Sequence, residues 1–296
     1  MSVNSTISHV FTQSKAKALV ELLKLRLSLL VTFSSAFGYL LAHRGVFDLE
    51  QFMMFCFGGF LITGASVTIN QIKEIKYDAV MSRTVGRPLP TNKIAPAEAQ
   101  VYSIILTVVG TIVLLVFTNI LTAVIALTSL ILYAYVYTPL KRVGPIAVFV
   151  GAIPGALPPL IGWVAASGTI SHEALIIFGI QFIWQFPHFW AIAWVSDDDY
   201  KKAGFKLLPA DGRKDLNTAI NIMVYTLFLL PLGLLPTYFG LTGITSGVIA
   251  TIFGVLFLSQ TFLLMKDYSR KSALKIMFSS FIYLPIVQIA YLVDKL

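Results

Sequence analysis

Apolar stretches of about 20 residues, the length that a helix needs to cross the hydrocarbon core of a bilayer, recur nine times along this chain. The sequence is 57% hydrophobic and only 12% charged, with a mean hydropathy of +0.81, whereas soluble domains carry roughly a quarter charged residues. We therefore predict an all-α polytopic membrane protein that forms one integral-membrane domain over residues 1–296. The expected membrane-spanning helices are 25–42, 52–69, 98–117, 121–138, 145–166, 173–195, 218–238, 243–265 and 273–292.

The basic residues indicate how the chain is oriented. If the N-terminus is cytoplasmic, every Lys and Arg except Arg44 and Lys295 lies in the polar tail 1–20, in an inner connection or at the inner end of a span. Cytoplasmic segments carry such an excess of Lys and Arg, so we predict a multi-pass protein of the cell (inner) membrane. The net charge of +8 therefore reflects topology, and nucleic acid is not an expected partner.

The termini and the cysteine content carry less information. Residues 1–14 are polar and lack the apolar segment and cleavage site of a signal peptide. The single cysteine, Cys56, lies in an apolar run, so there is no disulfide framework and no thiolate metal cluster.

The inner connection after the second span carries the most informative motif. Asn70, Glu74 and Asp78 are four residues apart, which places an amide and two carboxylates on one face of a helix. Arg83 and Arg87 follow at the same spacing. Oxygen ligands beside guanidinium groups suit a magnesium-bound diphosphate at the membrane surface. A solvated loop with helix-end charges is the alternative, which the regular spacing disfavours.

A second acidic segment follows the sixth span. It contains three consecutive aspartates, of which at most two can face one site on a helix, and it continues with Lys201 and Lys202. By itself the segment is typical of an acidic cap at the interface. Because it lies on the same inner side as the first motif, we expect Asp199, with Asp198 as the weaker candidate, to supply a second carboxylate.

Three tyrosines and a basic pair lie at the inner end of the fourth span. Tyrosines near an interface usually form an aromatic belt, and adjacent Lys and Arg usually set topology. The functional alternative is that Tyr137 shields an allylic cation while Lys141 and Arg142 hold a diphosphate.

Polar and helix-breaking residues also lie inside the fifth and sixth spans. The segment 151–162 is rich in Gly and Pro, which let helices approach closely or kink around a cavity. In the sixth span His188 lies among Trp184, Gln185 and Trp190. Such residues are costly in lipid unless they face a site or a partner. The residues alone leave open whether His188 is a packing residue or a ligand.

Taken together, these residues resemble the UbiA superfamily of intramembrane prenyltransferases, from about Leu22 to Pro209. Within that superfamily the Trp184-Gln-x-Pro-His188 and Asp199-Tyr200 segments are similar to the haem branch and not to the quinone branch. The other matching motifs are Asn70/Glu74/Asp78 with Met81-x-Arg83-Thr84, Tyr137 to Arg142, Gly155-Ala-x-Pro-Pro159-x-Ile-Gly162, and Leu208-Pro209.

The chain departs from the family pattern at three points. Glu74 stands where the family usually has aspartate, which lengthens the reach of the carboxylate by one methylene. The segment Lys24-Leu25-Arg26 lacks the proline that is common between its basic residues. The second acidic motif has Val195 and Ala203 where quinone-type relatives place a paired aspartate.

The resemblance implies nine helices around a central cavity open to the membrane, and a Mg²⁺-dependent reaction that releases diphosphate. The substrates would be farnesyl diphosphate and haem b, joined at a vinyl group to give haem O for terminal oxidases. Haem A synthase and oxidase assembly proteins would be the protein partners. The implied metal ligands are Asn70, Glu74, Asp78, Asp198 and Asp199, the diphosphate ligands Arg83, Arg87, Lys141 and Arg142, the cation-stabilising residue Tyr137 and the haem-binding residue His188.

Two alternative functions stay open on the sequence alone. A UbiA-type prenyltransferase with an aromatic or quinone acceptor would share the metal site and differ in the acceptor pocket. A secondary transporter would also have many helices and Gly/Pro-broken spans, with polar sites near the bilayer midplane. The charges of this chain gather at one membrane face, which disfavours transport.

Overall fold

The computed structural model describes residues 15–209 and 212–296, and this part of the chain contains nine helices that are long and apolar enough to cross a membrane. The all-α membrane fold predicted from hydropathy is therefore confirmed. The spans are α2 (Leu25–Ala42), α3 (Leu49–Asp78), α4 (Pro96–Phe117), the unit formed by α5 (Ile120–Ile131), η1 (Leu132–Tyr137) and α6 (Thr138–Leu140), α7 (Ile146–Ser167), α8 (His172–Val195), α10 (Leu216–Tyr238), α11 (Ile244–Asp267) and α12 (Arg270–Val293).

The part of the predicted polar tail that covers residues 1–14 lies outside the described residues. Residues 15–22 form a helical segment that leads into α2. A short helix, α9 (Asp197–Lys202), follows α8.

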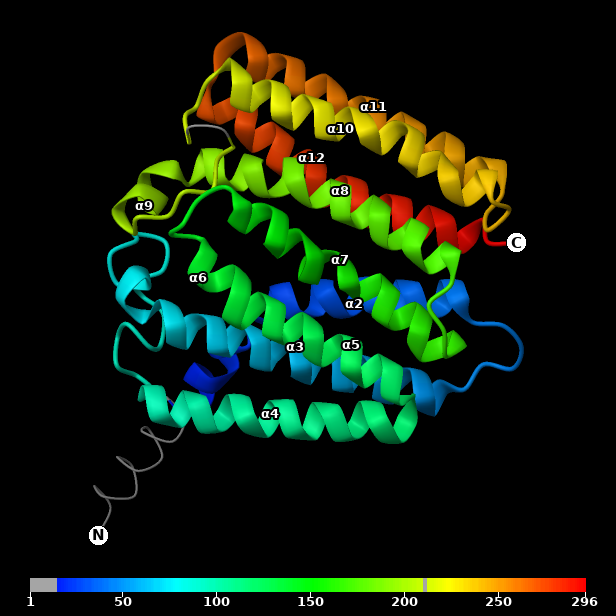
Figure 1. Cartoon of the computed structure of the whole chain (residues 1–296), viewed down its shortest axis with the longest axis horizontal. Helices are drawn as coiled ribbons and strands as arrows, with labels where there is room; N and C mark the ends of the chain where they lie inside the picture. Colours follow the sequence, from blue (N-terminus) through cyan, green and yellow to red (C-terminus); the bar gives the residue numbers. More distant parts are fainter. Residues whose placement is uncertain (1–14, 210–211) are drawn as a thin grey trace, which may run out of the picture.

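The spans lie side by side, and their long polar connections gather at one end of the bundle (Figure 1). The turn 79–95, α9 and the connection between α6 and α7 all lie at that end, and the C-terminus lies at the other. This arrangement brings together the two charged connections that are separated by four spans in the sequence. It is what the alternation of inner and outer connections predicts.

The central helix α7 packs closely on α2 because glycines face backbone. A Cβ at Gly162 would overlap the carbonyl oxygen of Ser35, and a Cβ at Gly38 would overlap that of Pro159. Small residues at a crossing let two membrane helices pack backbone to backbone. The Gly/Pro-rich span therefore forms a tight helix crossing in the middle of the bundle.

A proline in α7 leaves one backbone carbonyl free for side chains of α8. Pro159 has no N–H to donate to the carbonyl of Gly155, and Gln181 and Gln185 donate to it instead, at 2.8 and 2.9 Å. Gln181 also accepts from Ser34 and Gln288. Since the hydrocarbon core has no water to satisfy polar groups, this network holds α2, α7, α8 and α12 in one register.

Clefts open between the spans of the described residues. One, of about 310 Å³, is almost wholly apolar and lies between α5, α7 and the start of α8. The other, of about 370 Å³, lies between α3, α4 and η1 and includes Lys73 and Tyr135. Neither cleft is lined by Asn70, Glu74 or Asp78.

Candidate active site

The predicted first motif forms the C-terminal end of α3. This helix has 30 residues, or about 45 Å at 1.5 Å per residue, which is longer than the hydrocarbon core requires. Asn70, Glu74 and Asp78 lie one above the other on a single face, and their exposed fractions are only 1%, 4% and 0%. Three polar groups buried at this depth need partners or a ligand.

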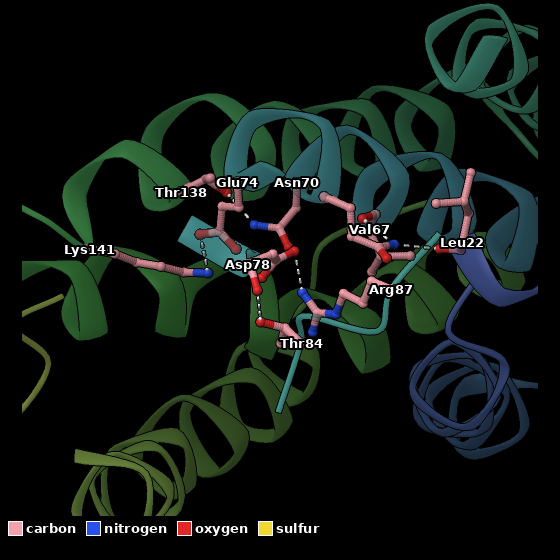
Figure 2. A network of polar contacts seen from close by, with 10 residues as sticks. Leu22, Val67, Asn70, Glu74, Asp78, Thr84, Arg87, Thr138 and Lys141 are labelled. Carbon is pink, nitrogen blue, oxygen red and sulfur yellow. Dashed lines mark hydrogen bonds and ion pairs between the residues drawn. The ribbon is translucent and has the colours of Figure 1, made fainter. Parts of the chain in front are cut away.

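Each of the three residues binds one partner from another segment, as Figure 2 shows. Arg87 donates from Nη1 to Oδ2 of Asp78 at 2.6 Å, and Lys141 donates from Nζ to Oε1 of Glu74 at 2.8 Å. Asn70 donates from Nδ2 to the hydroxyl of Thr138 at 3.0 Å. Two expected diphosphate ligands therefore lie directly against two expected metal ligands.

Each of these three residues also keeps one oxygen that accepts no hydrogen bond from the described residues. Oδ1 of Asp78 is fully buried without a partner. The side-chain contacts of Asn70 and Glu74 use Nδ2 and Oε1, which leaves Oδ1 of Asn70 and Oε2 of Glu74. Three oxygens on one helix face, with one carboxylate oxygen orphaned, fit the oxygen-ligand chemistry of Mg²⁺.

The turn that follows α3 folds Arg87 back onto Asp78. The hydroxyl of Thr84 donates to the backbone carbonyl of Asp78 at 2.9 Å, and the amide of Arg87 donates to the carbonyl of Thr84 at 3.0 Å. Met81 and Leu89, which belong to this turn, are buried. Thr84, which in the sequence is only part of a motif, thus helps to hold the turn at the site.

Asp199 lies against this turn and not beside the other carboxylates. Its two carboxylate oxygens accept from the backbone amides of Ser82 and Arg83, each at 3.2 Å, and Oδ1 also accepts from Lys202 at 3.2 Å. Desolvation would raise the pKa of Asp199, but these donors outweigh it and hold the pKa below its ordinary value. Asp199 therefore joins α9 to the turn after α3.

The structure does not bring Asp198 to this site. Its side chain is 93% exposed, and its nearest ionic partner is Lys214 at 4.0 Å. The buried aspartate of the acidic segment is instead Asp197, which pairs with Lys201 at 2.8 Å and Lys214 at 3.2 Å. Within the described ranges no three His, Cys, Asp or Glu residues gather as a metal site, so oxygen from Asn70 would have to complete one.

The segment around Tyr137 and Lys141 forms one wall of the site. The ring of Tyr137 lies flat on Gly151 of α7, where a Cβ would come within 2.6 Å of it, and Nζ of Lys141 lies 4.8 Å from its centre. Burial would lower the pKa of Lys141, but the Glu74 carboxylate outweighs burial and raises it. The wall therefore carries a firmly charged lysine above a buried aromatic ring.

The two remaining arginines lie further out, each over a tyrosine. Arg142 donates to the hydroxyl of Tyr77 at 2.6 Å, and its guanidinium lies 5.1 Å from the centre of that ring. The guanidinium of Arg83 lies 5.8 Å from the centre of the Tyr200 ring. Both side chains stand at the exposed edge of the carboxylate face.

A further basic residue, Lys24, belongs to this electrostatic cluster. It lies just before α2, in the left-handed region at φ 47°, which costs a non-glycine residue about 1–2 kcal/mol. Burial, followed by the positive charges of Arg87 and Lys141, lowers the pKa of Lys24 to about 7. In the sequence Lys24 is typical of a topology signal, and only the fold brings it near the charges of α3.

His188 lies half-buried between α8 and α12. Its Nδ1 is 2.9 Å from the hydroxyl oxygen of Ser280, and its ring stacks on Trp184 with centroids 4.3 Å apart. The neighbouring Phe189 lies 6.3 Å from Tyr137, centre to centre. A continuous aromatic wall thus connects His188 to the residues around Lys141.

The chain matches the family model of the UbiA prenyltransferase family over residues 30–284. It is 51% identical to a protein named protoheme IX farnesyltransferase from Cytophaga hutchinsonii, covering 96% of this chain and 99% of that one. It is 44% identical to a protein of the same name from Christiangramia forsetii, covering 93% of this chain and 92% of the relative.

Solved structures show the same fold. A digeranylgeranylglyceryl phosphate synthase superposes with a TM-score of 0.79 at 24% identity, covering 95% of this chain and 98% of the other. A UbiA homologue from Archaeoglobus fulgidus, bound to GPP and Mg²⁺, superposes with a TM-score of 0.66 at 15% identity, covering 93% and 99%. The helical architecture predicted here is therefore that of known membrane proteins.

Proposed function

The chain belongs to the UbiA prenyltransferase family, and on that premise we propose that it transfers the farnesyl group of farnesyl diphosphate to a vinyl group of haem b, giving haem O. The observation that carries this proposal is the 51% identity, over nearly the whole chain, to a relative named protoheme IX farnesyltransferase. The buried Asn70–Glu74–Asp78 face supplies the chemistry that such a reaction needs.

Asn70, Glu74 and Asp78 would hold Mg²⁺ through the oxygens that accept no hydrogen bond from the described residues. When bound, the metal would supply positive charge that offsets the negative charge of the diphosphate leaving group. Asp199 would act from the second acidic segment, whereas Asp198, which is 93% exposed, lies outside the site. Because Asp199 binds the backbone of Ser82 and Arg83, its contribution to the metal would come through this turn.

Arg87 and Lys141 would exchange partners when the diphosphate binds. Without substrate, both cations pair with carboxylates of α3, Asp78 and Glu74. A diphosphate bound beside these carboxylates would offer the cations a second anion. Arg83 and Arg142, at the exposed edge, would complete the set of cations. Positive charge aimed at the leaving diphosphate stabilises the transition state as the carbon–oxygen bond breaks.

The buried wall around Tyr137 would protect the farnesyl cation. Its ring packs against Gly151 inside the bundle. Aromatic rings attract cations, and the Lys141 ammonium already lies 4.8 Å from the centre of this ring. The terminal vinyl carbon of haem b bonds to C1 of the farnesyl group as diphosphate leaves. The positive charge then lies on the vinyl carbon that is attached to the porphyrin. Water adds to this carbon and loses a proton, which balances the reaction. No basic side chain is needed to activate the vinyl group.

His188 would bind the iron of haem b as the acceptor docks. It lies on the same aromatic wall as Tyr137, through Phe189, so a porphyrin bound there has a path to the farnesyl group. Histidine nitrogen is a common axial ligand of haem iron. The iron in this assignment belongs to the substrate haem b and not to a prosthetic group of the protein.

The direct test is an assay with farnesyl diphosphate, haem b and Mg²⁺ in membranes that contain this protein as their sole prenyltransferase. We expect a farnesylated, hydroxylated porphyrin and one diphosphate per product, both abolished by EDTA. Prenylation of an aromatic or quinone acceptor in place of haem would favour the alternative acceptor class. Substrate uptake without diphosphate release would favour a transporter.

We also propose that the protein lies in the cell (inner) membrane with a cytoplasmic N-terminus and active site. The charged connections that form the site lie at one end of the bundle, and the excess of Lys and Arg in these connections supports a cytoplasmic location for that end. Haem A synthase and oxidase assembly proteins stay the predicted protein partners, since they would use the product. Co-purification from native membranes tests that prediction.

A further inference from the structure

We propose that Ser280 is a positioning residue that presents Nε2 of His188 to the iron of the porphyrin substrate. The proposal rests on the proposed function and deepens it, because it names what prepares the histidine for its ligand. Ser280 lies on α12 and His188 on α8, so the contact crosses the interface of two spans.

The hydrogen bonds around Ser280 select the histidine tautomer. The serine hydroxyl donates its single proton to the backbone carbonyl of Met277 at 2.6 Å. Its oxygen can then only accept from His188, whose Nδ1 lies 2.9 Å away. Nδ1 therefore carries the imidazole proton, and Nε2 keeps a free lone pair.

Aromatic neighbours also hold the imidazole ring of His188 in its orientation. Trp184 stacks on His188 with an interplanar angle of 19°, and its indole N–H donates to the backbone carbonyl of Ser280 at 3.0 Å. Phe281 meets the ring edge to face at 5.1 Å. Ser280 thus binds both the histidine and the tryptophan beneath it, which leaves the imidazole little freedom to turn.

The free nitrogen is open to a ligand. Nε2 of His188 accepts no hydrogen bond from the described residues, yet it is not sealed off in the way that the indole nitrogen of Trp190 is. The nearby Phe278 and Phe281 are 56% and 42% exposed on the lipid-facing side of α12. A flat apolar molecule dissolved in the bilayer can therefore approach this nitrogen.

These features match what a metal-binding histidine requires. Such a residue binds through one ring nitrogen while the other donates to a fixed acceptor, which sets the ring orientation and strengthens the donor. Loss of the fixed acceptor typically weakens metal binding by about 10- to 100-fold. Iron protoporphyrin IX is the substrate class that supplies both a flat apolar ring and a metal.

The test compares Ser280→Ala with Ser280→Thr and with Ser279→Ala. Ser279 is the adjacent residue on α12 and is less buried than Ser280, so its variant is the matched control, and threonine restores the hydroxyl. Purified protein is titrated with haem b and, separately, with iron-free protoporphyrin IX. We expect Ser280→Ala to weaken haem b binding by about 10- to 100-fold and to shift its Soret band, with protoporphyrin IX binding unchanged.

Other results would overturn the inference. An unaltered haem b spectrum and affinity in Ser280→Ala would show that the hydroxyl does not prepare an iron ligand. Equal weakening for both porphyrins, or failure of Ser280→Thr to recover the band, would assign Ser280 a packing role only. If wild-type protein farnesylates haem b while Ser280→Ala behaves like wild type, the proposed function stands and only this inference fails.

Discussion

Arg87 and Asp78 form a buried ion pair in which the guanidinium Nη1 lies 2.6 Å from the carboxylate Oδ2, with side-chain exposures of 21% and 0%. Lys141 and Glu74 repeat the relationship one helical turn away at 2.8 Å. Each pair joins an expected substrate-binding cation to an expected metal-binding carboxylate. Each of the two α3 carboxylates is therefore paired with a cation of the chain itself, and an incoming diphosphate would compete for these cations.

The first prediction separates catalysis from structure at Asp78. Asp78→Asn leaves Arg87 without its partner, and breaking one side of a buried pair costs about 3–5 kcal/mol. We expect turnover to fall by at least about 100-fold, since an electrostatic contact to the transition state is lost. Product formation from farnesyl diphosphate and haem b, with thermal denaturation in detergent, measures both effects.

The double variant Asp78→Asn/Arg87→Gln is the decisive control for that prediction. Removing both charges restores balance, so we expect most of the lost stability to return while turnover stays low. Recovery of turnover together with stability would show that the pair is structural and that Asp78 holds no metal.

A second prediction concerns Lys24 and protons. Its pKa is lowered to about 7 by burial and by the charges of Arg87 and Lys141, so at pH 8 it is mostly neutral in the free protein. An arriving diphosphate stabilises the charged form and raises this pKa. Binding of farnesyl diphosphate at pH 8 should therefore take up a proton, which calorimetry in buffers of different ionisation enthalpy detects.

Lys24→Arg provides the comparison, because arginine is charged at every accessible pH. We expect the arginine variant to bind farnesyl diphosphate at pH 8 with less proton uptake than wild type. The same uptake in both proteins would assign the proton to another group.

Much of this fold could be predicted from hydropathy alone. Every expected span has a counterpart within the described residues, because a helix in lipid must be long, apolar and internally hydrogen-bonded. The common face of Asn70, Glu74 and Asp78 was equally predictable, since a spacing of four residues fixes a face wherever the helix continues.

The long-range partners could not be predicted in this way. That Asp199 binds the backbone of Ser82 and Arg83 depends on how α9 docks on a turn more than 100 residues earlier. Lys24 itself has the left-handed backbone conformation just before α2. Its position near the site depends on how α2 packs in the fold. Local periodicity contains neither fact, since both arise from contacts between segments distant in the sequence.

A third prediction tests the orientation of the bundle. Val46 and Val85 are exposed, at 95% and 47%, in connections at opposite ends of α3. With Cys56 replaced by serine, we expect Val46→Cys to react with a membrane-impermeant maleimide on intact cells. Val85→Cys should react only after permeabilisation, and the reverse pattern would contradict a cytoplasmic site.

The last prediction concerns the crossing of α2 and α7, on which the geometry of the site depends. A Cβ at Gly162 overlaps the backbone carbonyl of Ser35, and backbone cannot move aside as a flexible side chain can. We expect Gly162→Ala to destabilise the protein by about 1–3 kcal/mol or more, as overpacking does. Gly179 of α8 is the matched control, because no atom outside the neighbouring backbone of its own helix lies within 4 Å of its Cβ position. At position 179 alanine should stabilise the helix by about 1 kcal/mol through its higher helix propensity. Thermal denaturation in one detergent should therefore shift the unfolding midpoints of the two variants in opposite directions. Equal unfolding midpoints would contradict the close crossing.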